Sequence, residues 1–391
     1  MRQDFMQRAP LVLWLALSCA LALGCGEKAA EQAASAASSS AQAAAPSAAA
    51  LPSSKSSASA AASASAEALP LGPGGRASCE VEYDPQVLPD LNAKETTLQE
   101  QREAMVGRMR IMLGLDPKTA ARILELLSSS KMSGQGNPET TTHPISRAEC
   151  VEKRRNLPDE RERVCGAAFM VPIYDPATER KDQAKVCIDR YEFPGLPCEY
   201  PATWITAANA SALCKSLGKR LCDTHEWEGA CAGSLRPVEE EYDFKLPRES
   251  MSGVHNSKRK IVWAYGAKKD HKKCGTDSTK SKECSASGWK CGSNTYPAGS
   301  FPECKSSFGV YDQHGNAAEH MLLPLKPGDL GAKGGQGVAE MKGSWFIFQK
   351  HEAHKDDCRW RAPSWHDEEG LNHANYHLSF RCCKDIGSAA P

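Results

Sequence analysis

The density of cysteine is the feature that most constrains how this chain can fold. The sequence has 17 cysteines in 391 residues, and only Cys19 and Cys25 lie in the N-terminal apolar segment, which leaves 15 for the rest. So many cysteines indicate an oxidising compartment and several disulfides, which staple loop-rich chains. Because 15 is odd, at least one thiol stays free, binds a ligand or pairs between chains. The pairing itself does not follow from the sequence.

The first 25 residues have the pattern of an export signal. Two arginines precede the apolar run APLVLWLALSCALALGC, which is too short for a comfortable membrane span. The run ends in LALGC, which resembles a bacterial lipobox, so we predict residues 1–25 as a signal peptide with lipobox and Cys25 as the lipidation site. LALSC, ending at Cys19, is a rival lipobox, and an ordinary cleaved signal or an uncleaved anchor is an alternative.

All of these alternatives export the protein. We expect it at the cell envelope, held to the membrane through a lipid anchor, on the periplasmic or surface face of the outer membrane. Residues 26–76 are mostly Ala, Ser and Pro, with almost no large apolar side chain. Such a segment cannot bury enough surface to offset its ordering entropy, so we predict a disordered tether.

The remaining chain divides into two parts whose sequence patterns differ. The sequence of residues 77–165 predicts a small helical extension. Leu98–Met112 and Asp116–Ser130 have helical apolar spacing, and Pro117 stands at a first turn. Residues 166–385 predict the main domain, and residues 386–391 a tail. The 48 basic and 48 acidic residues balance, so no charge bias favours nucleic acid as a partner.

The sequence of the main domain predicts short helices and strands joined by long loops. Residues 167–175 and 185–194 have the apolar pattern of strands. Thr206 is placed to cap a helix that ends at Gly218, and a second short helix runs through Trp227. After Cys231 we expect no long helix. Further short strands are expected near residues 261–266, 308–311, 343–348 and 376–382.

Eight sequence motifs of the main domain occur in a distinctive order. They are CIDRYEFP (187–194), PATWITAANASALCKSLGKRLCDTHEWEGAC (201–231), VWAYG (262–266), YPAGSFPE (296–303), FGVYDQHGNAAEH (308–320), KGSW (342–345), CRWR (358–361) and LSFRC (378–382). Together they resemble the formylglycine-generating enzyme, or sulfatase-modifying factor, domain over about residues 166–385. The resemblance implies an α+β fold, a disulfide-rich variant of the C-type lectin-like fold that is low in regular secondary structure.

The resemblance also implies a structural calcium ion. In the family, the stretch that matches YDQHGNAAE wraps calcium. Carried over, Asp312 and Glu319 would give side-chain oxygens, and Gly315 and Ala317 backbone carbonyls, which is a set that calcium accepts. The alternative is a polar Gly-Asn turn without an ion. The family's second calcium site has no clear match after VWAYG.

The catalytic thiols of the family are the main departure. Its enzymes oxidise a substrate cysteine with O₂, using Cu(I) held by two cysteines just after the Gly-Ser motif that here contains Ser344. The first cysteine position falls at about Ile347, and Cys358 can stand in for the second. One thiolate cannot make a bis-thiolate copper site. We therefore expect Cys358 in a structural disulfide or as the odd free thiol.

Histidines could in principle replace the missing ligand. His351 and His354 lie close to Cys358 in sequence, and a second group follows, but a polar loop with surface histidines is the simpler interpretation. The helices of the extension show no histidine pattern for the non-haem iron of some relatives. The second group is His366, His373 and His377.

Several other motif residues have structural interpretations. Arg220 and Arg381 should make buried ion pairs or carbonyl hydrogen bonds. Cys382 and Cys383 should pair with distant cysteines rather than with each other. The tryptophans at 204, 227 and 345 should belong to the core.

The sequence thus predicts a lipoprotein whose domain binds or scaffolds at the envelope, with an unknown protein or glycan ligand and structural calcium. The alternative is an oxygen-dependent oxidase of protein cysteine, with copper, in which Cys358 and Ser344 are catalytic and His351 or His354 is a substitute ligand. A third interpretation is a purely structural envelope module. The family commonly has Trp-Glu-Trp where this chain has Ala318-Glu319-His320, which reshapes the neighbouring groove.

Overall fold

The computed structural model describes residues 91–157, 162–285, 288–333, 337–362 and 372–387. The predicted signal peptide, Cys25, the tether and Cys79 lie outside the described residues. Within the described ranges, no helix combines the length and the apolar character needed to cross a membrane.

Two capped helices form the N-terminal extension. Helix α1 (Leu98–Leu113) starts at a capping box in which Thr97 and Glu100 each bond the other's backbone N–H, and it ends at Gly114 in the left-handed conformation. Helix α2 (Pro117–Ser128) is capped by the Asp116 carboxylate. Both predicted helices are confirmed. Helix α3 (Arg147–Arg154) follows with a capping box of its own.

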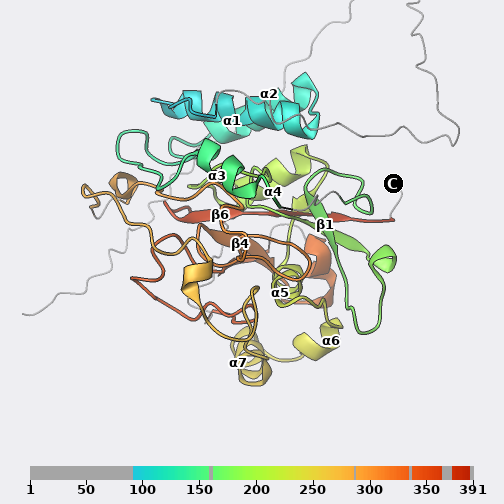
Figure 1. Ribbon diagram of the computed structural model, residues 1–391. Coiled ribbons are helices and arrows are strands. Elements are labelled where there is room, and N and C mark those ends of the chain that lie inside the picture. Colours follow the sequence, from blue (N-terminus) through green and yellow to red (C-terminus); the bar gives the residue numbers. More distant parts are fainter. Residues whose placement is uncertain (1–90, 158–161, 286–287, 334–336, 363–371, 388–391) are drawn as a thin grey trace, which may run out of the picture. The chain divides into compact units, whose positions relative to one another are not determined.

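The extension shares a hydrophobic core with the main domain. Met105 and Met109 of α1 and Ile123 of α2 are fully buried in one cluster with Leu213 of α4 (Ala207–Ser216) and Phe380. Figure 1 shows α1 and α2 side by side above α4 and the sheets. The extension is therefore packed as part of the folded body.

Two small sheets organise the main domain. A four-stranded antiparallel sheet has the order β1 (Met170–Ile173), β2 (Val186–Asp189), β7 (Cys382–Asp385), β3 (Arg220–Leu221). A three-stranded sheet has β4 (Ala318–Leu323) between antiparallel β5 (Val338–Lys342) and parallel β6 (Leu378–Phe380). Mixed helices and short sheets confirm the predicted α+β class.

Helix α5 (Thr224–Ala232) connects the two sheets. It packs against β4 and also against β1 and β2. The Asp223 side chain caps its first turn together with Glu226, and Gly233 ends it. All six residues of β4 are buried. The loop before β4 and the end of α5 are consequently held against the centre of the domain.

Part of the secondary-structure prediction after Cys231 was wrong. Residues 261–266 and 308–311 form isolated bridges rather than strands, and residues 343–348 follow β5 as a turn. Helix α7 (Arg248–Lys258) and the short α6 (Val238–Glu241) were not predicted. The 3-10 turns are Lys181–Gln183, His271–Lys273, Trp289–Cys291 and Pro327–Ala332.

Every described cysteine belongs to a disulfide. Cys382 and Cys383 bond Cys214 and Cys222 respectively, which confirms distant rather than vicinal pairing. The two bonds tie β7 to the segment from α4 to β3. The other five disulfides are Cys150–Cys198, Cys165–Cys187, Cys231–Cys358, Cys274–Cys304 and Cys284–Cys291.

Candidate functional site

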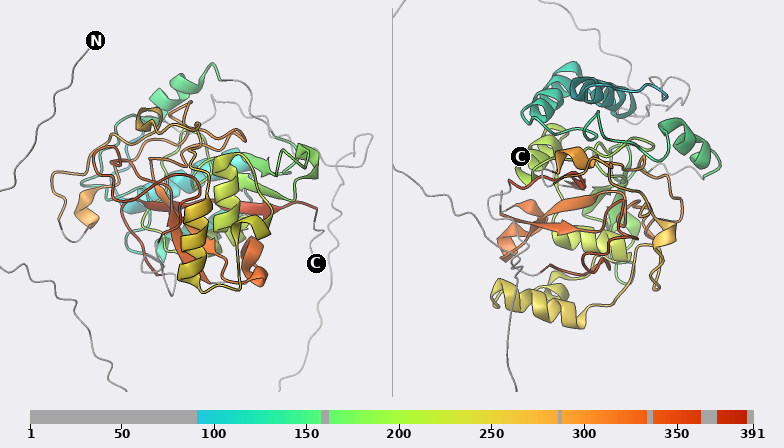
Figure 2. Two further views of the ribbon diagram at one scale, coloured as in Figure 1. Left: turned by 90° about the horizontal axis from the view of Figure 1, so that it is seen from below. Right: turned by 90° about the vertical axis from the view of Figure 1, so that its left-hand side faces the viewer.

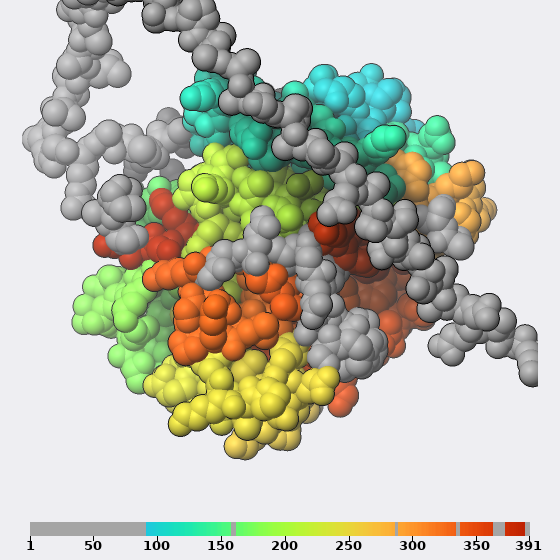
Figure 3. All heavy atoms as spheres, turned by 180° about the vertical axis from the view of Figure 1, so that it is seen from behind, coloured from blue at the N-terminus to red at the C-terminus, as the bar shows by residue number. Residues whose placement is uncertain are grey.

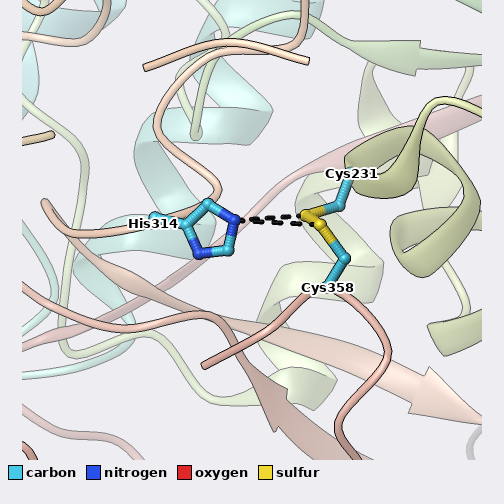
Figure 4. A group of neighbouring side chains, drawn as sticks. All are labelled: Cys231, His314 and Cys358. Carbon is cyan, nitrogen blue, oxygen red and sulfur yellow. Dashed lines mark hydrogen bonds between the residues drawn. A yellow bond between two sulfur atoms is a disulfide. The ribbon is translucent and has the colours of Figure 1, made fainter. Parts of the chain in front are cut away.

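The site expected for chemistry contains a disulfide in place of a free thiol. Cys358 is bonded to Cys231 of α5, and both side chains are buried, with relative exposures of 0% and 1%. Figure 4 shows the two sulfur atoms joined, with the His314 ring directed at them. A disulfide sulfur carries no thiolate charge, so in this state neither sulfur is a Cu(I) ligand. Of the two fates expected for Cys358, the structure shows the structural disulfide.

His314 approaches this disulfide without forming a hydrogen bond to it. Its Nε2 atom lies 3.3 Å from the sulfur of Cys231 and 3.8 Å from that of Cys358. The same Nε2 accepts the backbone N–H of Ala264 at 3.0 Å. Because Nε2 is thus an acceptor and a disulfide has no hydrogen to donate, the ring proton belongs on Nδ1, which faces Asp356 at 3.7 Å.

Asp356 gathers hydrogen-bond donors from three loops. Its Oδ2 accepts the Ser344 hydroxyl at 3.0 Å, and its Oδ1 accepts the Trp263 indole N–H at 3.1 Å. His271 Nε2 lies 3.3 Å from Oδ2. Burial opposes ionisation, but the neighbouring His271 and His314 rings outweigh it and hold the pKa of Asp356 well below its usual range. Asp356 is therefore a fixed anion that joins these loops.

Ser344 has a structural position. Its side chain has no exposed surface, its hydroxyl donates to Asp356, and it accepts the backbone N–H of Gly315 at 2.9 Å. Ile347, at the position expected for the first catalytic cysteine, is also buried among aromatic side chains. Neither residue presents a reactive group at a surface.

Two groups of potential metal ligands occur among the described residues, and both are built on disulfides. They are Cys231, His314 and Cys358, and Cys222, Glu226 and Cys383. The predicted calcium residues and the histidines near Cys358 do not form such a group within the described ranges.

Glu319, a member of the predicted calcium set, lies on β4 and forms an ion pair with an arginine. Its carboxylate makes a two-point ion pair with Arg381, at 2.5 Å and 2.6 Å, and one oxygen also accepts the Trp227 indole N–H at 2.9 Å. All three side chains are buried. This confirms the expected buried ion pair of Arg381, and it leaves no oxygen of Glu319 without a strong partner.

Gly315 has the conformation that the turn requires. Its φ is +76°, and a Cβ atom there would lie 2.7 Å from the carbonyl oxygen of Gly275. The next backbone N–H, of Asn316, donates to that same carbonyl. The Ala317 N–H donates to Glu192 at 2.8 Å. The turn is thus fixed by hydrogen bonds of its own.

Asp312 has a spare side-chain acceptor among the described residues. Its Oδ2 accepts the Gly299 N–H at 2.6 Å, while its buried Oδ1 has no hydrogen-bond partner among the described residues. Burial raises the pKa of Asp312 to about 6. Burial, and then Asp312 and Glu319, raise the pKa of Glu192 well above its usual value. Glu192 was not predicted as part of this cluster.

The fit to calcium is therefore incomplete. Asp312 offers an oxygen, but Arg381 already neutralises Glu319, the second carboxylate of the set. Glu192, Asp312 and Glu319 place three buried carboxylates around the single arginine Arg381, which leaves excess negative charge. The pKa values of Glu192 and Asp312 are raised, so these two groups tend to stay protonated. Calcium binding stays a prediction, and Asp312 is the residue that tests it.

The histidines near Cys358 take part in aromatic packing. His354 stacks on Trp360 with ring centroids 5.0 Å apart, and His377 stacks on Trp345 at 4.7 Å. His354, Trp360 and His377 are partly exposed. Burial lowers the pKa of His377 to about 3, so its ring is neutral near pH 7. His351 and His373 are exposed, and His366 lies outside the described residues.

The remaining motif residues have structural roles. Arg220 pairs with Glu226 and Asp385. The tryptophans at 204, 227 and 345 are buried, as predicted.

A match to a family model identifies the domain. A family model described as "Sulfatase-modifying factor enzyme 1-like domain" matches residues 169–386. No curated protein matches this chain. A solved structure titled "Crystal Structure of CarF" is 12% identical, covers 56% of this chain and 98% of its own, and has a TM-score of 0.31. Because the family model spans more than half of the chain, the protein belongs to the sulfatase-modifying factor enzyme 1-like domain family.

Proposed function

We propose that this protein is an exported lipoprotein whose sulfatase-modifying-factor domain binds or scaffolds at the cell envelope and is not an oxidase. The observation that carries the proposal is the buried Cys231–Cys358 disulfide. Copper oxidation of a substrate thiol needs a pair of free thiolates to hold Cu(I). Every described cysteine is paired, and Ile347 stands at the expected first-thiol position.

The aromatic surface beside Ser344 supports a binding function. His354, Trp360 and His377 present partly exposed rings, with His354 stacked on Trp360 and His377 stacked on the buried Trp345. The Trp345 indole N–H has no hydrogen-bond partner among the described residues. Aromatic rings with a nearby donor suit a ligand that stacks and accepts hydrogen bonds, such as a glycan or an aromatic protein side chain. We propose this surface as the contact region.

Copper titration and a substrate assay test the main claim. We expect the purified, oxidised protein to bind no stoichiometric Cu(I) and to leave a Cys-x-Pro-x-Arg peptide unconverted. The alternative oxidase would use Cys358 with His351 or His354, and His314 Nε2 lies 3.8 Å from the Cys358 sulfur. A tight 1:1 Cu(I) complex lost in Cys358→Ser, together with peptide conversion, would establish the oxidase and refute the binding function.

Lipidation is tested separately. The run ending at Cys25 and the seven disulfides both fit export. We expect labelled palmitate to be incorporated into the wild type and into Cys19→Ser, and not into Cys25→Ser. Label retained by Cys25→Ser and lost in Cys19→Ser would assign the rival lipobox, and no label in any chain would remove the anchor from the proposal.

A further inference from the structure

A short segment of this neutral chain concentrates positive charge. Residues 254–273 contain seven lysines or arginines and one aspartate, whereas the whole chain has 48 of each sign. The segment covers the end of α7, the hairpin at Trp263 and the following 3-10 turn. Figure 2 shows α7, in yellow, at the side of the molecule away from α1 and α2.

Three of the seven cations are used within the protein. Arg259 makes a two-point ion pair with the buried Asp357, at 2.8 Å and 2.9 Å. Lys269 pairs with Glu352, and Lys273 pairs with Glu303 at 3.4 Å. The one aspartate of the segment, Asp270, caps the backbone N–H of Lys272. The other four cations are exposed and make no ion pair or side-chain hydrogen bond within the described residues: Lys258, Lys260, Lys268 and Lys272.

A tight turn joins the two runs that carry these lysines. The backbone groups of Trp263 and Gly266 exchange two hydrogen bonds, so the chain reverses between the runs 258–260 and 268–272. The first arm is held to the body because the Cys358 N–H donates to the Val262 carbonyl at 2.9 Å. We call the four lysines together with Ile261 the lysine patch.

Aliphatic side chains lie among these charges. Ile261 is 54% exposed and Val254 is 38% exposed, which makes them two of the four large hydrophobic residues that stand out on the described surface. Figure 3 shows the yellow segment that contains them as an open face at the edge of the molecule. Exposed aliphatic groups beside cations match the boundary between lipid headgroups and acyl chains.

We propose that the lysine patch docks on anionic phospholipid headgroups of the membrane. All four free cations are lysines, which act as point charges on diffuse negative surfaces. The one arginine of the segment, Arg259, could bind a carboxylate or phosphate with two hydrogen bonds, but it already pairs with Asp357. The neutral charge balance of the whole chain, with 48 basic and 48 acidic residues, does not favour nucleic acid as the partner. The choice of a membrane rests in part on the proposed lipid anchor, which would keep the domain close to headgroups.

Lysine footprinting on the full chain tests the proposal. The purified protein is mixed with vesicles of pure phosphatidylcholine or of phosphatidylcholine with phosphatidylglycerol, treated with an acylating reagent, and analysed by mass spectrometry. We expect labelling of the four patch lysines to fall at least about threefold on anionic vesicles only, and the protection to vanish in high salt. Lys94, Lys118 and Lys131, in or near α1 and α2, serve as internal controls and should label equally throughout.

Variants give the matched comparison. In a Cys25→Ser chain, which lacks the proposed anchor, replacing the four patch lysines by glutamine should lower the fraction bound to anionic vesicles at least about tenfold, since each lysine near such a surface adds about a fivefold gain. The same replacement of Lys94, Lys118 and Lys131 should leave binding unchanged. Equal labelling on both vesicle types, or protection by an acidic protein or DNA without protection by lipid, would overturn the proposal. The intact mass of the same sample reports the acyl chains, so loss of the anchor and loss of docking are distinguished.

Discussion

Arg381 is the buried cation that interacts with the carboxylates of Glu319, Glu192 and Asp312. It bonds both oxygens of Glu319 and also donates to the carbonyls of Asp189 and Tyr311. Burial would lower the pKa of this arginine, but Glu319 reverses the effect and raises it. The pair joins β4 to the residue between β6 and β7, so its loss reaches both sheets.

Removing one partner of this pair should be costly. We expect Glu319→Gln to lower the free energy of unfolding by about 3–5 kcal/mol, because the buried guanidinium loses its counter-charge. Urea unfolding measures the change. Glu303→Gln, at an exposed ion pair with Lys273, is the control and should change stability by less than about 1 kcal/mol. Equal effects of the two substitutions would contradict this account.

Asp312 should make stability depend on pH in the opposite sense to an ordinary carboxylate. Its folded pKa of about 6 exceeds the ordinary value of 3.8, so folding favours the protonated form. That contribution is complete below about pH 4 and is lost as pH rises through about 6. In chelator, we expect Asp312→Asn to lack this decline and to be more stable than the wild type at neutral pH. Urea unfolding at several pH values measures it.

The same variant decides the calcium question. If calcium binds at Asp312, millimolar calcium should raise the melting temperature of the wild type and leave that of Asp312→Asn unchanged. If it does not bind, neither protein responds. If the wild type and Asp312→Asn instead show the same dependence of stability on pH, the pKa of Asp312 does not rise on folding, and the carboxyl is ionised in the folded protein at neutral pH.

At the scale of secondary-structure elements, Glu199 links the N-terminal extension to the main domain. It pairs with Arg108 of α1 and, at 2.7 Å, with Arg147 of α3. Burial would raise the pKa of Glu199, but the two arginines lower it to about 2. Gln135 also donates to it at 2.7 Å. One buried carboxylate thus fixes both helices.

Loss of this charge should loosen α1 and α3 first. We expect Glu199→Gln to cost about 3–5 kcal/mol and to speed amide hydrogen exchange in these helices more than in β4. Glu125→Gln, at an exposed pair with Arg122 on α2, is the matched control and should change exchange little. Uniform acceleration across the whole chain would show that the extension does not open separately.

Elements with local signals could be predicted from the sequence. Thr97, Asp116 and Thr206 each cap a helix that the pattern indicated. Strand β4 gave no such signal, because it is buried on both faces and so lacks alternation. Helix α7 was also not predicted, because Gly253 and several serines interrupt its apolar stripe.

The site depended on pairings that no local pattern contains. Glu192 stands alone in CIDRYEFP, and only the fold brings it to Asn316 and Ala317, more than a hundred residues away. Likewise, the sequence showed that Cys358 lacked a second thiol for copper, but not that Cys231, 127 residues earlier, was its partner. Long-range contacts of this kind are set by the whole chain.

At the scale of the whole molecule, disulfides that close long loops should contribute most to stability. Cys231–Cys358 spans 127 residues and Cys284–Cys291 spans 7. Chain entropy then predicts a loss of about 4–5 kcal/mol for the double change Cys231→Ser with Cys358→Ser, against about 2–3 kcal/mol for Cys284→Ser with Cys291→Ser. Thermal unfolding of the two double variants provides the comparison. Because α5 and the loop around Asp356 both meet at the longer bridge, its removal should also release His314 from its packed position. A smaller loss for the longer bridge would mean that other contacts already hold these segments together, and that the disulfide is free to act in chemistry rather than in folding.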